Sequence, residues 1–541
     1  MKKLNQLFVL ILLLNSICVY AQKASWGPVN QSKKKYRPYI RANNESGIFV
    51  SSYQGNKLLI EKYSSNGQKK VMSKIIDPPR AGKYKINVDH IVVIDKDFVI
   101  FADYYDKSER KNHVFAFKVD GSTGKIKKKD QELFVEEVDN KRRKGTYRVK
   151  LSEDKSKVLI NFFAYHKKEG EYIDKYKLLD KNLVTDFEKE YQINREDADH
   201  YFTFNYIIDN EGSVYFLASK KDGFYAVTMD VNVDYEKWEE KIDIDNLAPG
   251  SSITDLTFLL NKEGHMVVSG FYNKLENKKK RNGKIKKKVH YGGVDGCLFV
   301  KINYKTKEVD VAKVSEFSKE FKNQFLTEKD AKKGREASIA SNFNKINIEL
   351  KDNGGLVMVA ELYYYFYTTD NNGGLTSEHW YYGDLVAVNF TSDGELKWAN
   401  RIPKNQVWHW NSIFGIIVGP FFPRPFIAPN SYNYLDYLSF SSSLTEDKLY
   451  VVFNDHPVNA EMNASQSEKN IPKKHTKVYK SVQTVYEIDL NTGEKNKSVL
   501  KSGNNHKLIM KPRRSHQENQ GEDQIIFSQR GNKYSYGVFK P

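Results

Sequence analysis

The chain has very little cysteine and, after its first residues, no long hydrophobic run. Its 541 residues include only two cysteines, Cys18 and Cys297. Cys18 lies in the N-terminal segment, so a chain that has lost this segment can form no internal disulfide and must depend on a large apolar core. Cys297 begins the apolar run 298–300, which predicts a small buried side chain rather than a catalytic thiol. No later segment reaches the roughly 18 apolar residues of a membrane-spanning helix.

Motifs that carry metal or nucleotide chemistry are also missing. The sequence contains no HExxH, CxxC, calcium loop, G-x-S-x-G elbow, phosphate-binding loop or dinucleotide fingerprint. Five histidines recur at irregular spacing, which predicts chance neighbours rather than a zinc site: His290, His379, His409, His456 and His475. We therefore expect no cofactor and no metal ion.

The N-terminal residues are typical of a secretion signal. Lys2 and Lys3 are followed by an apolar stretch over 7–14 and by a small-residue cleavage site ending at Ala21. Bulky Ile17 stands before Cys18 where lipidation prefers a small residue, so a free exported chain is favoured over a lipoprotein. The sequence predicts a signal peptide over 1–21 and a periplasmic or extracellular protein.

Positive charge exceeds negative charge. The 86 Lys and Arg outnumber the 68 Asp and Glu, for a net charge of +18 at pH 7. Such a surface favours acidic partners, and we expect a cell-envelope protein or an acidic glycan, with peripheral contact to an anionic membrane as a further alternative and no nucleic acid. Because the excess is spread along the chain, an ordinary solvated surface is the favoured explanation of the charge itself. The oligomeric state stays open.

A module recurs about eight times over the rest of the chain. Each copy is a short polar turn that runs into a burst of apolar β-formers, as in 95–97 before 98–101 and 210–212 before 214–217. A second apolar strand and a Gly- or Asn-containing turn follow, as at 393–394. Strand-built repeats of a few dozen residues predict a β-propeller. We expect one all-β propeller domain over 22–541 with about eight four-stranded blades, or seven if the first and last modules share a blade.

The final module stops at Pro541 without a fourth strand. Propellers often close by taking this strand from the other end of the chain, which removes an exposed edge. A segment near Trp26 to Asn30 is therefore expected to supply the missing outer strand.

Two strand-and-turn segments carry a resemblance to known repeats. The stretch 386–398, with Asp393-Gly394 before Trp398, resembles the repeat of secreted bacterial β-propellers of the kind exported by Bacteroidetes. The stretch 486–494 is similar to pyrroloquinoline-quinone-like propeller repeats. The resemblance implies the fold only, because it covers single strands and turns and includes no cofactor-binding motif.

Long connections gather in modules five to seven. If the four strands of a blade are lettered A to D in chain order, the B–C and D–A loops of a propeller emerge on one face, so the long connections are predicted there. The A–B turns emerge on the opposite face, and because they are short we expect that face to be plain. Long loops in a compact domain are usually functional or disordered. The connections run over 273–293, 317–342, 368–383, 401–434 and 455–480.

Two of these connections have a clear local pattern. The first, 274–290, carries two lysine-rich runs around Asn282-Gly283 and predicts a long basic hairpin. The second places Phe317, Phe321 and Phe325 four residues apart after Ser315, which predicts a short helix capped by that serine and packed on the rim.

Aromatic residues are concentrated in two other connections. The apolar run 407–426 is broken by Gly and Pro and predicts neither a strand nor a helix, while 378–382 reads Glu-His-Trp-Tyr-Tyr. Exposed aromatic groups suit a sugar ring or a protein hot spot, although a plug buried beneath neighbouring loops is the alternative. The candidate ligand- or partner-binding residues are Trp380, Tyr381, Tyr382, Trp408, His409, Trp410, Phe421 and Phe422.

These patterns favour a non-catalytic exported propeller that binds a cell-envelope protein or a glycan through the loop-rich face of blades 5–7. The alternative is a glycan-active hydrolase or lyase with its site on the same face. Its candidate residues are Glu378, His379, His409, Asp455 and His456. Catalysis requires such groups to converge on one substrate position, and a binding module does not.

Overall fold

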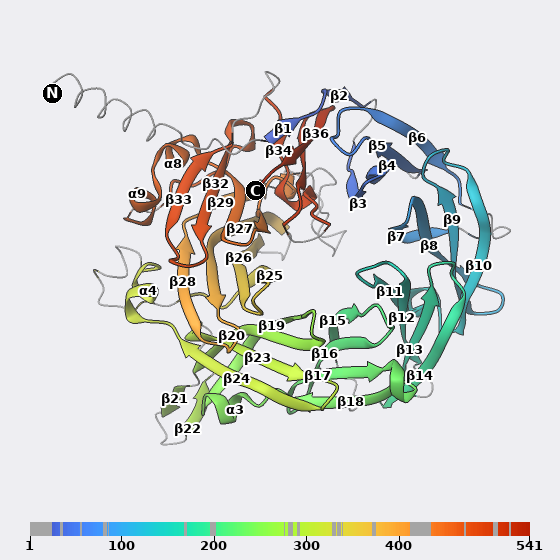
Figure 1. Cartoon of the computed structure of the whole chain (residues 1–541), viewed down its shortest axis with the longest axis horizontal. Helices are drawn as coiled ribbons and strands as arrows, with labels where there is room; N and C mark the ends of the chain where they lie inside the picture. Colours follow the sequence, from blue (N-terminus) through green and yellow to red (C-terminus); the bar gives the residue numbers. More distant parts are fainter. Residues whose placement is uncertain are drawn as a thin grey trace, which may run out of the picture.

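The computed structural model shows eight four-stranded antiparallel sheets arranged around a common axis (Figure 1). This is a single eight-bladed β-propeller, as the repeat predicts, and the seven-bladed alternative is wrong. The structure describes residues 24–541 apart from these gaps: 33–35, 55–56, 79–83, 85, 167–169, 195–201, 275, 280–284, 289–292, 327–331, 333–336, 338, 370–374, 412–433, 470–471, 501–506 and 519–520. The expected signal peptide over 1–21 lies outside the described residues.

Blades 1 to 4 are built from consecutive strands with short connections. Apolar residues in the second and third strands of each blade are buried, because both faces of these strands lie against neighbouring blades. The strands are β3 (Tyr39–Asn44), β4 (Gly47–Gln54), β5 (Lys57–Tyr63), β6 (Lys70–Ile76), β7 (Asn87–Ile94), β8 (Asp97–Asp106), β9 (Lys111–Asp120), β10 (Ile126–Glu137), β11 (Thr146–Leu151), β12 (Lys157–His166), β13 (Glu171–Asp180), β14 (Thr185–Asn194), β15 (Phe202–Ile208), β16 (Val214–Lys220), β17 (Gly223–Asp230) and β18 (Glu236–Lys241). The short helical elements of this half are η1 (Lys141–Arg143), η2 (Val231–Val233) and, leading into blade 5, α3 (Ile244–Leu247).

Blades 5 to 8 follow the same order and carry additional elements. Their blade strands are β19 (Ser251–Leu260), β20 (His265–Lys274), β23 (Gly296–Asn303), β24 (Glu308–Glu316), β25 (Phe343–Leu350), β26 (Leu356–Thr369), β27 (Leu375–Phe390), β28 (Leu396–Ile402), β30 (Phe440–Leu444), β31 (Lys448–Asp455), β32 (Val482–Asp489), β33 (Lys495–Val499), β34 (Ile509–Met510), β35 (Gln524–Arg530) and β36 (Lys533–Phe539). The additions are β21 (Glu276–Lys279), β22 (Ile285–Lys288), α4 (Lys319–Asn323), β29 (Gln406–Asn411), α8 (Pro457–Glu461), α9 (Ala464–Lys469), η3 (Val478–Lys480) and η4 (Pro512–Arg514).

The core is divided into eight apolar clusters, each lying between two consecutive blades. The cluster between blades 1 and 2, for example, packs Phe49 and Ile60 against Phe98 and Phe117. Corresponding clusters follow around the ring and end with the pair formed by blades 8 and 1. Each blade is therefore stabilised mainly by its two neighbours, as in other repeat architectures.

The first described strand closes the ring, as the missing fourth strand of the final module predicts. In β1 (Ala24–Trp26), Ala24 pairs with Phe539 and Trp26 with Gly537 of β36. The short β2 (Asn30–Gln31) pairs with the start of the same strand. Blade 8 thus contains segments from both ends of the chain, which lie side by side in Figure 1. The outer edge of β36 is thus covered by β1 and β2.

Some local predictions are confirmed and others are wrong. Cys297 is fully buried, and burial raises the pKa of its thiol, so a structural role is confirmed. The helix after Ser315 exists as α4, but its cap is Ser318, whose hydroxyl accepts a hydrogen bond from the amide of Phe321 at 3.1 Å.

The plain A–B face is interrupted in blade 8, where η4 and residues 515–518 separate β34 from β35. Among the described residues, no helix is long and apolar enough to cross a bilayer.

Candidate functional site

Blade 6 carries a long aromatic extension. Its two central strands, β26 and β27, have 14 and 16 residues and remain paired as far as Thr369 and Leu375. The predicted loop over 368–383 is therefore mostly strand, and that prediction is wrong. β29 adds to β27 as a third strand, with Trp408 opposite Trp380 and His409 opposite His379. We call this three-stranded extension (362–369, 375–383 and 406–411) the aromatic hairpin.

The aromatic hairpin has two faces because strand residues alternate between sides. We call the side that packs against the inner strands of blades 7 and 8 the inner face, and the other side the outer face. The inner face carries Tyr363, Tyr365, Tyr367, Glu378, Trp380, Tyr382, Trp408 and Trp410. The outer face carries Tyr364, Phe366, Ser377, His379, Tyr381 and His409.

The inner face is anchored on an apolar cluster. Trp380 and Tyr382 are only 6% and 2% exposed and pack with Leu438 and with Ile509 of β34. The Trp408 ring stacks on Tyr434 with the centroids 4.3 Å apart. The base of the face is therefore fixed, and the side chains that remain accessible are Tyr365 at 40% and Tyr367 at 60% exposed.

The outer face is a ladder of stacked rings. Phe366 and His379 lie 4.4 Å apart and nearly parallel, and His379 stacks on His409 at 6.1 Å. Burial, then His409 and Lys474, lower the pKa of His379, so its ring is neutral at pH 7. Tyr364 remains 56% exposed at the edge of this ladder. Aromatic area is thus accessible on both sides of the extension.

A buried ion pair holds the root of the aromatic hairpin. Lys404 Nζ lies 2.8 Å from Glu361 Oε1, and both side chains are fully buried. Burial lowers the pKa of Lys404, and the attraction of Glu361 opposes this shift. Glu361 also accepts a hydrogen bond from the Ser439 hydroxyl at 2.6 Å, and Gln406 donates to the backbone oxygen of Asn454 at 2.7 Å. Blades 6 and 7 are locked together at the point where the extension leaves the ring.

The candidate catalytic groups of the enzyme alternative occupy separate positions. Glu378 lies on the inner face, 1% exposed, and accepts a hydrogen bond from the Tyr365 hydroxyl at 2.7 Å. His379 and His409 lie on the outer face, and the Ser377 hydroxyl is 2.8 Å from His379 Nε2. Neighbours in the sequence thus point to opposite sides of the sheet.

Asp455 and His456 belong to a helix cap in blade 7. Asp455 accepts hydrogen bonds from the His456 amide at 2.7 Å and the Asn459 side chain at 2.8 Å. His456 Nδ1 accepts the amide of Val458 and begins α8. These contacts explain the Asp-His pair by local structure. Within the described residues, no group of three or more His, Cys, Asp or Glu side chains could hold a metal ion.

The remaining predicted binding residues divide into three groups. Trp408, His409 and Trp410 lie on β29, so the prediction that this run forms no strand is wrong for 406–411. Tyr381 lies on the outer face, with Lys474 Nζ 5.2 Å from its ring centroid. Phe421 and Phe422 lie outside the described residues. The basic segment forms a hairpin, β21 with β22, as predicted.

The aromatic run over 363–367 was not among the predicted site residues. It directly follows the buried burst 356–360 on the same strand, and its five consecutive aromatic residues were the signal available in the sequence. A run so rich in tyrosine has no polar turn to end the strand, which is why the strand continues beyond the ring.

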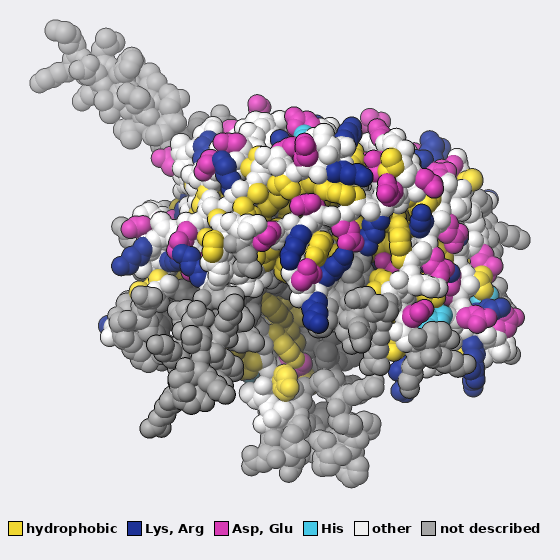
Figure 2. Space-filling model, turned by 90° about the horizontal axis from the view of Figure 1, so that it is seen from below, with side chains coloured by type: hydrophobic (Ala, Val, Ile, Leu, Met, Phe, Trp, Pro, Cys, Tyr) yellow, Lys and Arg dark blue, Asp and Glu magenta, His cyan; other side chains and the backbone are white. Residues whose placement is uncertain are grey.

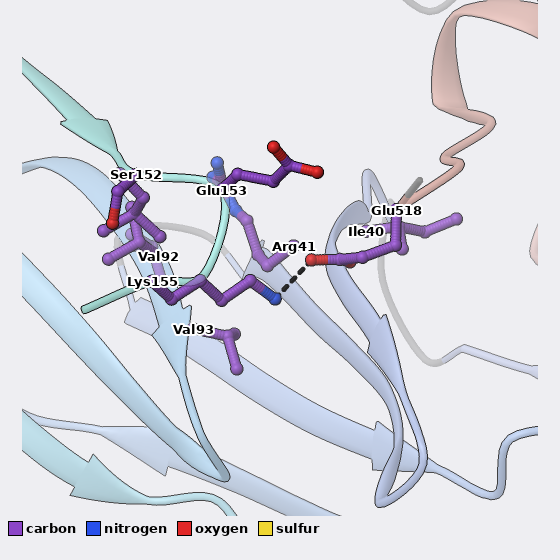
Figure 3. A pocket seen from close by; sticks show the side chains of 10 residues that line it. Ile40, Arg41, Val92, Val93, Ser152, Glu153, Lys155 and Glu518 are labelled. Carbon is purple, nitrogen blue, oxygen red and sulfur yellow. Dashed lines mark ion pairs between the residues drawn. The ribbon is translucent and has the colours of Figure 1, made fainter. Parts of the chain in front are cut away.

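A second candidate site is a pocket of about 340 Å³ between the inner strands of blades 1 to 3 (Figure 3). Glu518 reaches it from blade 8 and forms an ion pair with Lys155 of blade 3. Its carboxylate also accepts the Asn43 amide and lies 2.9 Å from His516 Nε2. Burial raises the pKa of Glu518, but the bonds from His516, Lys155 and Asn43 outweigh it and lower the pKa to about 2. This carboxylate connects three blades, which is a structural role.

Surface charge gives no single patch on the side of the ring seen in Figure 2. Basic and acidic side chains are interspersed there, and a narrow run of hydrophobic side chains extends from the body of the ring toward one rim. The net charge of +18 is therefore not concentrated on this side.

Comparisons with known proteins assign neither a family nor an activity. No family model and no curated protein matches the sequence. Among solved structures, the chain is similar to the WD40 domain of SCAP from fission yeast, with a TM-score of 0.42, 7% identity, and 95% and 98% of the two chains covered. It is also similar to the polysaccharide lyase Uly1, with a TM-score of 0.39 and 10% identity, and the match covers 95% of this chain and 99% of the lyase chain. A third similar structure is prolyl oligopeptidase B from Galerina marginata, with a TM-score of 0.38 and 8% identity. The match covers 94% of this chain and 56% of the peptidase chain. At these values the class of protein, an eight-bladed β-propeller, rests on the chain's own sheets.

Proposed function

We propose that the protein is an exported, non-catalytic propeller that binds a cell-envelope protein or glycan through the loop-rich face of blades 5–7. The observation that carries this proposal is the aromatic hairpin, which holds Tyr364, Tyr365 and Tyr367 at 40% to 60% exposure. Large aromatic side chains left accessible on a rigid support are typical of a binding surface.

The support is stiff enough to present a preorganised surface. The buried pair Lys404–Glu361 fixes the root, and Trp380 and Tyr382 anchor the inner face. Tyrosine has few rotatable bonds, so little conformational entropy is lost when a ligand packs on it. A ring of eight blades thus acts as the scaffold, and the hairpin supplies the contact area.

The contacts of the candidate acid and base groups favour binding over catalysis. Glu378 is buried under Tyr365, and Asp455 caps α8, so both carboxylates are engaged in local structure. His379 stacks between Phe366 and His409 on the opposite side of the sheet from Glu378. A general acid and base must reach one substrate position, and the Glu378 carboxylate does not share a face with His379 and His409.

The test compares the mature chain (22–541) with Y364S/Y367S in capture from envelope extract, followed by protein and polysaccharide staining. Both tyrosines are exposed, whereas Tyr365 is left intact because it donates to buried Glu378. The control is Y53S, which removes a tyrosine of blade 1 that is 39% exposed. Retention by the wild type and Y53S, with loss in Y364S/Y367S, is the expected result. Equal retention by all three would overturn the proposal.

Export is the second part of the proposal and has its own test. Expression of the full chain in a Gram-negative host should give a mature protein that begins at Gln22, as read by mass spectrometry of the N-terminal peptide. A product that retains residues 1–21 in the cytoplasmic fraction would contradict this part.

A further inference from the structure

Two arginines lie against aromatic rings in and beside the cluster beneath the inner face. The guanidinium of Arg513, in the middle of blade 8's η4, lies 5.0 Å from the ring centroid of Tyr382. The guanidinium of Arg530, at the end of β35, lies 5.8 Å from the ring centroid of Tyr479. Both arginines are exposed, and neither forms an ion pair with a described carboxylate.

The rings that the two arginines contact belong to one packed group of aromatic side chains. Tyr382 lies 5.1 Å from Tyr363, and Trp380 lies 5.4 Å from Tyr365. On the other side, Tyr434 stacks on Trp408 and lies 6.1 Å from Tyr479, which is 53% exposed. Trp380 and Tyr382 are buried in this cluster, and the rings that stay accessible to a ligand are Tyr365, Tyr367 and Tyr479.

Carboxylates that lie against this surface are buried and engaged. Glu378 is bonded by the Tyr365 hydroxyl, Glu361 is paired with Lys404, and Asp436 is held by Arg514 at 2.9 Å. None of the three is more than 7% exposed. Of these described charged groups, the exposed ones are therefore the two guanidinium groups.

We infer that the ligand of the inner face is a carboxylate-bearing glycan, a polymer containing uronic acid units. This inference rests on the proposed function and names its ligand class. Sugar rings pack their C–H faces on tyrosine, and the planar fork of an arginine matches a carboxylate with two parallel hydrogen bonds. A neutral glycan would use the tyrosines and leave both guanidinium groups without an anionic partner.

The test is binding by isothermal titration at low and physiological salt. The probes are oligosaccharides of galacturonate, mannuronate/guluronate and hyaluronate, with the same oligosaccharides after chemical reduction of their carboxyl groups. The variants are R513Q, R530Q and their combination. The control is R142Q, which changes an exposed arginine in η1, between β10 of blade 2 and β11 of blade 3. The expected result is binding of at least one acidic probe, weakened at least about tenfold in each site variant and unchanged in R142Q. The reduced probe should bind weakly in all proteins, and the salt dependence should diminish in the double variant.

The outcomes separate this inference from the proposed function. Equal binding of acidic and reduced probes would overturn the uronate inference, and so would acidic binding that is unaffected by R513Q/R530Q. In either case, loss of probe binding in the variant Y367S would still support the proposal that the aromatic hairpin binds a ligand. Capture of a dextran sulfate or of an envelope protein, with no uronate bound, would also overturn it. Loss of acidic binding in Y364S but not in Y367S would assign the site to the outer face and contradict the inference.

Discussion

The two halves of the ring share one core and differ in their connections. In blade 4, β16 and β17 are joined by a turn of two residues, between Lys220 and Gly223. In blade 6 the corresponding strands extend beyond the ring and gain β29 as a third partner. The clusters between blades are nevertheless of the same kind in both halves. The comparison shows that long additions leave the same kind of blade-to-blade packing in place, so the ring tolerates extra strands at one sector.

The additions of blades 6 to 8 also support one another. The segment after β31 folds as α8 and α9 and returns along β29, where the Val407 amide donates to the backbone oxygen of His475 at 2.9 Å. Burial and the neighbouring His456 lower the pKa of His475 to about 4, so this histidine is neutral inside the assembly. The segments added to blades 6 and 7 therefore enclose buried polar groups such as His475.

The largest effect is expected from the feature common to both halves, the closing strand. Deletion of 23–34 removes β1, β2 and the partly buried Trp26, and leaves the edge of β36 unpaired. We expect a loss of about 4 kcal/mol or more, seen as a melting temperature lower by several degrees. Adding a peptide of residues 22–34 in trans should restore part of it. An unchanged melting temperature would refute the closing role of this segment.

The next effect concerns the elaborated half alone. Lys404→Met leaves Glu361 as a buried charge without its ammonium partner, and should cost about 3–5 kcal/mol in urea unfolding. The matched control is Lys262→Met, whose partner Asp352 lies at 3.3 Å on the surface, with an expected cost below about 0.5 kcal/mol. The double variant K404M/E361L should recover most of the loss. A cost for K404M no greater than that for K262M would show that the root of the hairpin is not held by this pair.

A smaller effect is expected at Glu518, where blade 8 contacts blades 1 and 3. Because Glu518 has a pKa of about 2 in the fold, below the roughly 4.3 of an unfolded glutamate, its carboxylate stabilises the fold above pH 4.3, and this contribution is lost as the pH falls toward 2. Glu518→Gln should cost about 1–2 kcal/mol at pH 7, after allowance for solvent screening. The difference from wild type in urea midpoint should shrink between pH 4.3 and 2. Glu153→Gln, in the same pocket, should change nothing, and a difference that stayed constant down to pH 2 would contradict the linkage.

The smallest effect on stability should accompany a loss of binding. Tyr367→Ser removes a side chain that is 60% exposed, so the free energy of unfolding should change by no more than about 0.5 kcal/mol. Tyr53→Ser is the counterpart in the plain half. If Tyr367→Ser destabilised the fold by 2 kcal/mol or more, the tyrosine would be part of the core of the extension and not of a contact surface.

Much of the ring could be predicted from the sequence because its pattern is local. A polar turn before an apolar burst fixes the second strand of each blade, and the blade repeats eight times. The closing strand followed from the missing fourth strand of the last module, although β1 and β36 are far apart in the sequence. Strand alternation and edge protection are general properties, so they apply without knowledge of the site.

The site could be predicted only as a region. The length of β27 depends on pairing with β29, and β29 is fixed by contacts of Gln406 with Asn454 and His475, which lie in another blade. Such non-local pairing leaves no periodic signal in an apolar run like 407–411. The helix cap shifted to Ser318 because Ser315 still pairs with Cys297 in β24. Arg513 lies in η4 and Arg530 at the end of β35, and only the fold brings them to neighbouring aromatic rings.

The joining of both ends in blade 8 also determines when the ring can form during biosynthesis. Of the described strands, β1 is the first to leave the ribosome and its partner β36 the last. A contact across about 500 residues forms slowly, since the intervening chain must first be ordered. A chain that has not yet been synthesised through β36 therefore cannot close the ring, and its β1 segment stays unpaired. The β1–β36 pairing thus makes synthesis through β36 a condition for the closed ring.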